Sequence, residues 1–116
     1  MGAIAAGLAV ALGAFGAHIL ADRVTPDRLE TFKTGVQYHL IHALALMMAG
    51  WAASQWPGWP VEWAGYLFLA GIVLFSGSLY LLVLTDTRWL GAITPLGGVA
   101  FIAGWGMLAW AAFRGG

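Results

Sequence analysis

Long uncharged stretches alternate with short charged segments along the chain. No Asp, Glu, Lys or Arg occurs in residues 1–21, 34–61, 63–85 or 89–113. Each stretch reaches the roughly 20 apolar residues that a helix needs to cross a bilayer core of about 30 Å. The pattern therefore predicts four membrane-spanning helices. We expect them at about residues 2–20, 29–53, 62–84 and 91–113.

Local turn signals separate the first three spans. Thr25-Pro26-Asp27 is typical of a helix start, because Thr can cap, Pro suits the first turn and Asp meets the positive end of the helix dipole. Pro57-Gly58-Trp59-Pro60 cannot continue a helix, and it marks the second loop. Four tryptophans near this loop are typical of an interfacial aromatic belt: Trp51, Trp56, Trp59 and Trp63.

Composition narrows the class of protein. Hydrophobic residues make up 61% of the 116 residues and charged residues 9%, against about a quarter charged in soluble domains. A net charge of zero argues against a basic surface that binds nucleic acid. The absence of Cys excludes disulfides and thiolate metal sites. We therefore predict a single all-α integral membrane domain over residues 1–116, an antiparallel bundle of four transmembrane helices in contact with the lipid bilayer.

Small residues dominate the first span and recur in the others. Membrane helices associate through small residues that let their backbones approach closely. We expect the first helix either to be central in the bundle or to present one face to another protein. The glycines expected to pack helices together are Gly13, Gly16, Gly35, Gly77, Gly97 and Gly98.

A minority of polar residues lies inside the predicted spans. The candidate cluster is His18, Tyr38, His39, His42, Ser76, Ser78, Tyr80 and Thr94. An ionisable residue within a membrane is a functional-site hypothesis by default, although neutral histidines also make interhelical hydrogen bonds that only fix packing. Both interpretations stay open here. We expect His18 and His42 to approach each other, or to share partners, in one leaflet.

Four sequence blocks carry a resemblance to a known family. They are GAFGAH at residues 13–18, TGVQYHLIHALA at 34–45, LFSGSLY at 74–80, and TPLGG at 94–98 followed by Gly104-Trp105. In this order they resemble the transmembrane protein 256 family, small bacterial membrane proteins of the domain-of-unknown-function 423 type. The resemblance implies a small helical membrane protein and supplies no reaction. His18 and His42 fall on motif positions, whereas at His39 the resemblance leads us to expect a glutamine in relatives.

Three classes of function remain open. The first is a non-enzymatic accessory, assembly or interaction subunit, with a membrane-protein partner or a second copy of the chain. The second is a small oligomeric permease or lipid- or quinone-handling protein that uses the polar cluster in the cytoplasmic leaflet. The third is a haem or metal protein using the three histidines, although CxxCH and HExxH patterns are absent. We expect no enzyme, cofactor or metal site, because no catalytic constellation can be assembled.

Basic residues give the expected orientation. The first and third loops carry Arg23, Arg28, Lys33 and Arg88, whereas the opposite side carries Arg114. The positive-inside rule then places both termini on the periplasmic side of the bacterial inner membrane. The first span lacks a basic start and a small-x-small cleavage site, so we expect a retained helix rather than a signal peptide.

Overall fold

The computed structural model describes residues 2–115, and almost all of them are helical. The α-helices are α1 (Gly2–His18), α2 (Pro26–Gln55), α3 (Trp59–Gly71), α4 (Gly77–Thr85) and α5 (Thr94–Gly115). Short 3-10 turns, η1 (Leu20–Asp22) and η3 (Arg88–Ala92), precede α2 and α5, and a π-helical turn, η2 (Ile72–Ser76), joins α3 to α4. The predicted all-α class is confirmed.

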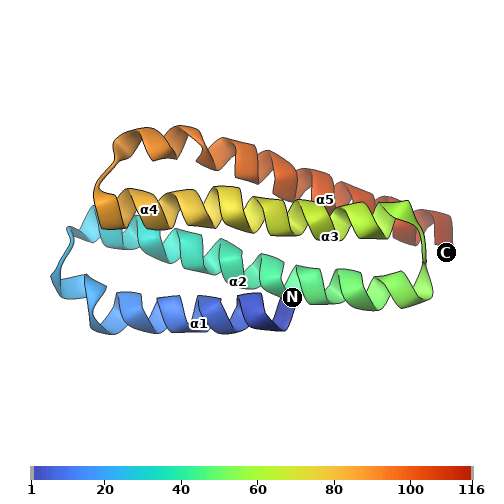
Figure 1. The fold of residues 1–116 in the computed structure, drawn as a ribbon, viewed down its shortest axis with the longest axis horizontal. Helices are drawn as coiled ribbons and strands as arrows, with labels where there is room; N and C mark the ends of the chain where they lie inside the picture. Colours follow the sequence, from blue (N-terminus) through green and yellow to red (C-terminus); the bar gives the residue numbers. More distant parts are fainter. Residues whose placement is uncertain (1, 116) are drawn as a thin grey trace.

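The helices run antiparallel in a flat arrangement of 49 × 26 × 16 Å (Figure 1). The elements α3, η2 and α4 form one continuous rod, which packs between α2 and α5. The helix α1 lies beside the first part of α2, and its N-terminus reaches only about the middle of the molecule in Figure 1. Three segments are long and apolar enough to cross a membrane: Gly2–Asp22, Trp59–Thr85 and Arg88–Arg114.

The helix boundaries follow from capping and from proline. The Thr25 hydroxyl accepts a hydrogen bond from the Arg28 backbone N–H at 3.3 Å, so α2 begins at Pro26, earlier than expected. Pro60 lies in the first turn of α3, where no backbone N–H is required, and α3 therefore begins before it. Pro95 likewise fixes the start of α5 at Thr94, because an α-helix that began earlier would need its missing N–H.

The prediction that the first helix is central in the bundle is wrong. Along its length α1 packs against α2 alone, with Gly2 beside Met47 and Gly16 beside the Phe32 ring. Small side chains let these two backbones come close, but they do not extend far enough to reach a second helix on the other side. Phe15, near the end of α1, does contact the cluster around Phe32.

Apolar clusters hold the two ends of the molecule. At the end with the α1–α2 and α4–α5 connections, Phe32 is fully buried against Leu20, Leu82 and Val83. At the opposite end the cores are built mostly from alanine, which permits close packing between α2, α3 and α5. These cores contain Ala45, Ala49, Ala64 and Phe68, and then Ala52, Val61 and Ala111.

Candidate functional site

His42 is buried between α2 and α5, and both of its ring nitrogens are hydrogen-bonded. The Trp105 indole N–H donates to Nε2 at 3.0 Å, and Nδ1 lies 2.8 Å from the Tyr38 carbonyl oxygen. Since Nε2 accepts, Nδ1 carries the hydrogen and donates to Tyr38. The Phe101 ring stacks on the imidazole with a centroid distance of 3.5 Å. No nitrogen of His42 is left free to bind a ligand in this arrangement.

His39 faces the other side of α2. Its Nδ1 lies 2.8 Å from the Tyr80 hydroxyl of α4, and the backbone of Ala5 in α1 lies against the same ring. The Tyr80 ring also packs against the Phe32 ring, with a distance of 5.1 Å between the ring centroids. His39 therefore joins α2 to α4 at the point where α1 also approaches.

Ser76 and Ser78, in the rod formed by α3, η2 and α4, make further contacts between helices. The fully buried Ser76, at the end of the π turn, donates to the Gly35 carbonyl oxygen of α2 at 2.7 Å. Ser78 donates to the Phe75 carbonyl oxygen at 2.8 Å, so it accepts from the Thr94 hydroxyl at 2.6 Å. The second contact joins α4 to the first residue of α5.

The polar side chains buried in the bundle have hydrogen-bond partners inside the bundle. Within residues 2–115, every buried side-chain nitrogen or oxygen has a hydrogen-bond partner. The expected single cluster divides into three groups: Ser76, Tyr80 and His39 meet around Gly35, His42 bonds to Trp105, and Ser78 bonds to Thr94. An unpaired polar group in hydrocarbon costs several kcal/mol, so these pairs hold helices in register.

His18 does not join the other members, and the prediction that it approaches His42 or shares its partners is wrong. His18 is exposed at the end of α1, whereas His42 is buried. The register explains the separation: Gly16 lies beside Phe32, and His42 lies ten residues further along α2, roughly 15 Å away at about 1.5 Å per residue.

The predicted packing glycines fall into two groups. A Cβ atom at Gly16, Gly35 or Gly97 would lie 3.0 Å or less from a neighbouring side chain or backbone. Gly13, Gly77 and Gly98 have ordinary or open surroundings, with no atom nearer than 3.4 Å. Sequence reasoning missed Gly71, whose Cβ position is blocked by the Phe101 ring. Gly104, one of the small residues expected to pack in the last span, is blocked in the same way by the Phe68 ring. Their signal is a bulky aromatic residue at the same level of the facing helix.

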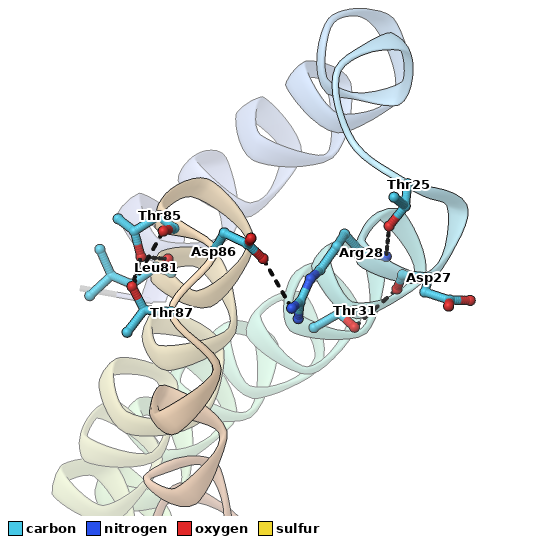
Figure 2. A network of polar contacts seen from close by, with 8 residues as sticks. All are labelled: Thr25, Asp27, Arg28, Thr31, Leu81, Thr85, Asp86 and Thr87. Carbon is cyan, nitrogen blue, oxygen red and sulfur yellow. Dashed lines mark hydrogen bonds and ion pairs between the residues drawn. The ribbon is translucent and has the colours of Figure 1, made fainter.

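A polar network fastens the end of the molecule that carries most of the charge (Figure 2). Arg28 in the first turn of α2 pairs with Asp86 after α4, with an N···O distance of 3.0 Å. Asp86 adopts a left-handed conformation with φ of 53°, which ends α4 and directs its carboxylate towards α2. Hydroxyls of Thr85 and Thr87 bond to each other at 2.8 Å beside it. Sequence reasoning missed this pair because nothing in the sequence specifies which charges meet.

The pockets are not lined by the predicted polar residues themselves, although Trp105, which donates to His42, lines one of them. Three pockets of about 610, 330 and 290 Å³ are lined by residues other than the histidines, serines, Tyr80 and Thr94. In the part of the chain that the structure describes, no three His, Asp or Glu side chains come together as metal ligands.

Apolar helices long enough to span a bilayer, joined by internally satisfied polar pairs, define a helical membrane protein. Residues 12–98 match the family model described as protein of unknown function (DUF423). A UPF0382 membrane protein of Bacillus subtilis (strain 168), YwdK, is 54% identical over 98% of this chain and 94% of its own length. UPF0382 membrane proteins of Staphylococcus aureus (strain bovine RF122 / ET3-1) and Staphylococcus haemolyticus are 47% and 44% identical over 98% of this chain and 93% of their own lengths. The chain therefore belongs to the DUF423 family of membrane proteins, as the sequence blocks predicted. No solved structure matches it significantly.

Proposed function

We propose that the protein is a non-enzymatic interaction subunit of the bacterial inner membrane, in which α1 binds a partner membrane protein. The observation that carries the proposal is the placement of α1, which packs along α2 and leaves its opposite side uncovered. That opposite side, here called the outer face of α1, includes the exposed small residues Ala3, Gly7, Ala11 and Ala14, flanked by the larger exposed side chains of Ile4, Leu8 and Val10. Small residues at regular helical spacing let another helix backbone approach closely.

The proposed topology has four membrane passes. The helix α2 carries too many polar groups to qualify by hydropathy, but it runs antiparallel between α1 and the α3–α4 rod. If α1 and the rod each cross the bilayer, the chain must cross back through α2. Its 30 residues measure about 45 Å, which is ample. Because His39 and His42 are hydrogen-bonded inside the bundle, their burial in hydrocarbon leaves no unpaired group.

The permease or quinone-handling alternative has weaker support. It requires the histidine, serine and tyrosine side chains to line a space that a substrate can enter. These side chains instead bond to one another and to backbone carbonyls, as in the Ser76–Gly35 and His42–Trp105 contacts. The pockets described above are lined by other residues, apart from Trp105, which lines one of them. A fastening role for the polar pairs fits these contacts better.

Two glycines offer a matched test of the proposal. A Cβ atom at Gly7 in α1 or at Gly106 in α5 would meet nothing within 4 Å, so a larger side chain is tolerated by the isolated fold at both positions. Gly7→Leu would nevertheless block close approach of a partner to the outer face of α1. Gly106→Leu adds the same bulk to α5 and serves as the control.

The experiment is affinity purification of each variant from native membranes in mild detergent, with thermal unfolding measured on the same samples. We expect neither variant to unfold below the wild-type temperature, because Leu has a higher helix propensity than Gly, and Gly7→Leu alone to lose the copurifying protein. Retention of the partner by Gly7→Leu, or an equal loss from both variants, would contradict the role of α1.

A further inference from the structure

A pocket of about 330 Å³ lies where the α2–α3 turn meets the end of α5. We propose that it binds a phosphate group, supplied by the headgroup of an anionic phospholipid. The residues that carry the chemistry are Gln55 and Trp56 from the end of α2, Trp59 from the start of α3, and Arg114 from α5. The proposal goes beyond the interaction role and does not depend on what binds α1.

The polar side chains of this pocket are suited to an acceptor. Arg114, Trp56 and Trp59 carry N–H donors and no acceptor, and the Gln55 amide can also donate. No Asp or Glu lines the pocket, and the nearby Glu62 lines a different groove. Within residues 2–115, the Arg114 guanidinium and the two indole N–H groups have no hydrogen-bond or ion-pair partner. A phosphate oxygen satisfies such donors, and Arg binds phosphate in a two-pronged geometry.

The backbone beside the pocket adds to the same preference. Gly58 precedes α3 with φ of +142° and provides no side-chain cap, in contrast to Thr25 before α2. Pro60 has no N–H and the Glu62 N–H bonds to the Gly58 carbonyl, so the Trp59 N–H and the positive end of the α3 dipole are the backbone groups that lie next to Arg114 across the pocket. They reinforce the attraction for an anion that the side chains establish.

An adjoining groove indicates a lipid rather than soluble phosphate. Trp56 also lines a second pocket, of about 290 Å³, which follows α2 and α5 away from the turn. Met48, Trp51 and Leu108 make this second pocket almost entirely apolar. A phospholipid has the same division, with a phosphate at one end and an acyl chain beside it. The exposed Trp51 and Trp59 indoles are typical of the depth at which headgroups lie.

Native mass spectrometry of the delipidated full chain in detergent tests the site. The probe is dioleoyl-phosphatidylglycerol, titrated against the wild type, Arg114→Gln, Trp59→Phe and the control Arg23→Gln at the opposite end of the molecule. We expect Arg114→Gln to weaken the lipid Kd about tenfold, as for loss of a charge-assisted hydrogen bond. We expect Trp59→Phe to weaken it by a smaller factor, and Arg23→Gln to leave it unchanged.

A competition with inorganic phosphate separates the two sources of the anion. We expect millimolar phosphate to leave the lipid complex intact, because phosphate cannot occupy the apolar groove. Displacement of the lipid by phosphate at comparable concentration would assign the site to soluble phosphate and overturn the lipid source. Equal lipid affinity of Arg114→Gln and the wild type, or equal weakening by Arg114→Gln and Arg23→Gln, would overturn the site itself.

Discussion

Gly97 and Gly98 are neighbours in the sequence with opposite surroundings. A Cβ atom at Gly97 would lie 2.3 Å from the Phe75 backbone nitrogen, whereas one at Gly98 would lie 4.0 Å from the Phe75 ring. Gly97 therefore sets the distance between α5 and the π turn, and Gly98 does not. The two positions carry the same residue, so only the structure distinguishes their roles.

Alanine at these two positions gives the first prediction. Gly97→Ala must push backbone away from backbone, which costs about 1–3 kcal/mol of unfolding free energy. Gly98→Ala has room and gains helix propensity, a stabilisation of up to about 1 kcal/mol. Thermal unfolding of both variants in the same detergent measures the difference. Equal stability of the two variants would show that α5 does not approach Phe75 as closely as described.

At the scale of single residues, the sequence predicts which positions inside the spans are polar, but not which residues they form hydrogen bonds with. The uncharged runs identify His39, His42 and Ser76 as polar groups within spans, and hydrogen bonds to each are present. The choice of partner depends on register between helices. His42 meets Trp105, 63 positions along the chain, and no local pattern specifies such a pairing.

At the scale of helices, polar and aromatic contacts connect elements that lie far apart in the sequence. The helices α2 and α5 touch mainly through Tyr38 and His42 on one side and Phe101 and Trp105 on the other. The π turn η2, between α3 and α4, places Ser76 against Gly35 of α2. Its extra residue shifts the faces of the rod between α3 and α4, which a uniform 3.6-residue pattern does not anticipate.

A double-mutant cycle on His42 and Trp105 gives the second prediction. Each of His42→Phe and Trp105→Phe leaves one partner of the hydrogen bond unsatisfied, whereas the double variant removes both polar groups. We expect the double variant to be more stable than the sum of the single losses implies, with a coupling energy of about 0.5–2 kcal/mol. Chemical or thermal unfolding in detergent measures it. His39→Phe combined with Trp105→Phe is the control and should be additive, because His39 bonds to Tyr80 instead.

The helix boundaries show how far local rules reach. Thr25-Pro26 identifies the start of α2 to within three residues, because capping and proline act locally. The expectation of a central first helix was wrong, because small residues indicate close packing without showing how many neighbours a helix has. The register between helices depends on contacts between distant residues, which the sequence pattern alone does not provide.

At the scale of the whole molecule, the charge distribution predicts the orientation in the membrane. The Arg28–Asp86 pair holds the first and third loops together, and the same end carries Arg23, Lys33 and Arg88. From the positive-inside rule we expect this end to lie in the cytoplasm. We then expect the turn between α2 and α3, with Ser54 and Arg114 nearby, to face the periplasm.

The natural absence of cysteine makes this orientation directly testable. Ser54→Cys and Asp22→Cys place single thiols at opposite ends, both at exposed positions outside the expected spans, and Asp22 avoids disturbing the Thr25 cap. We expect an impermeant thiol reagent to label Ser54→Cys in intact cells, and Asp22→Cys only after the membrane is permeabilised. The reverse pattern would mean that the termini lie in the cytoplasm.

Photo-crosslinking in living membranes tests the central claim, that the outer face of α1 binds another protein. A photoreactive amino acid is placed at Gly7 and Ala14 on α1. The control positions are the exposed Val73 in η2 and the exposed Ile102 in α5. The account predicts a protein–protein crosslink from Gly7 and Ala14, and no protein crosslink from Val73 or Ile102, which face lipid. Crosslinks from Val73 and Ile102 alone, or none from any of the four positions, would contradict it.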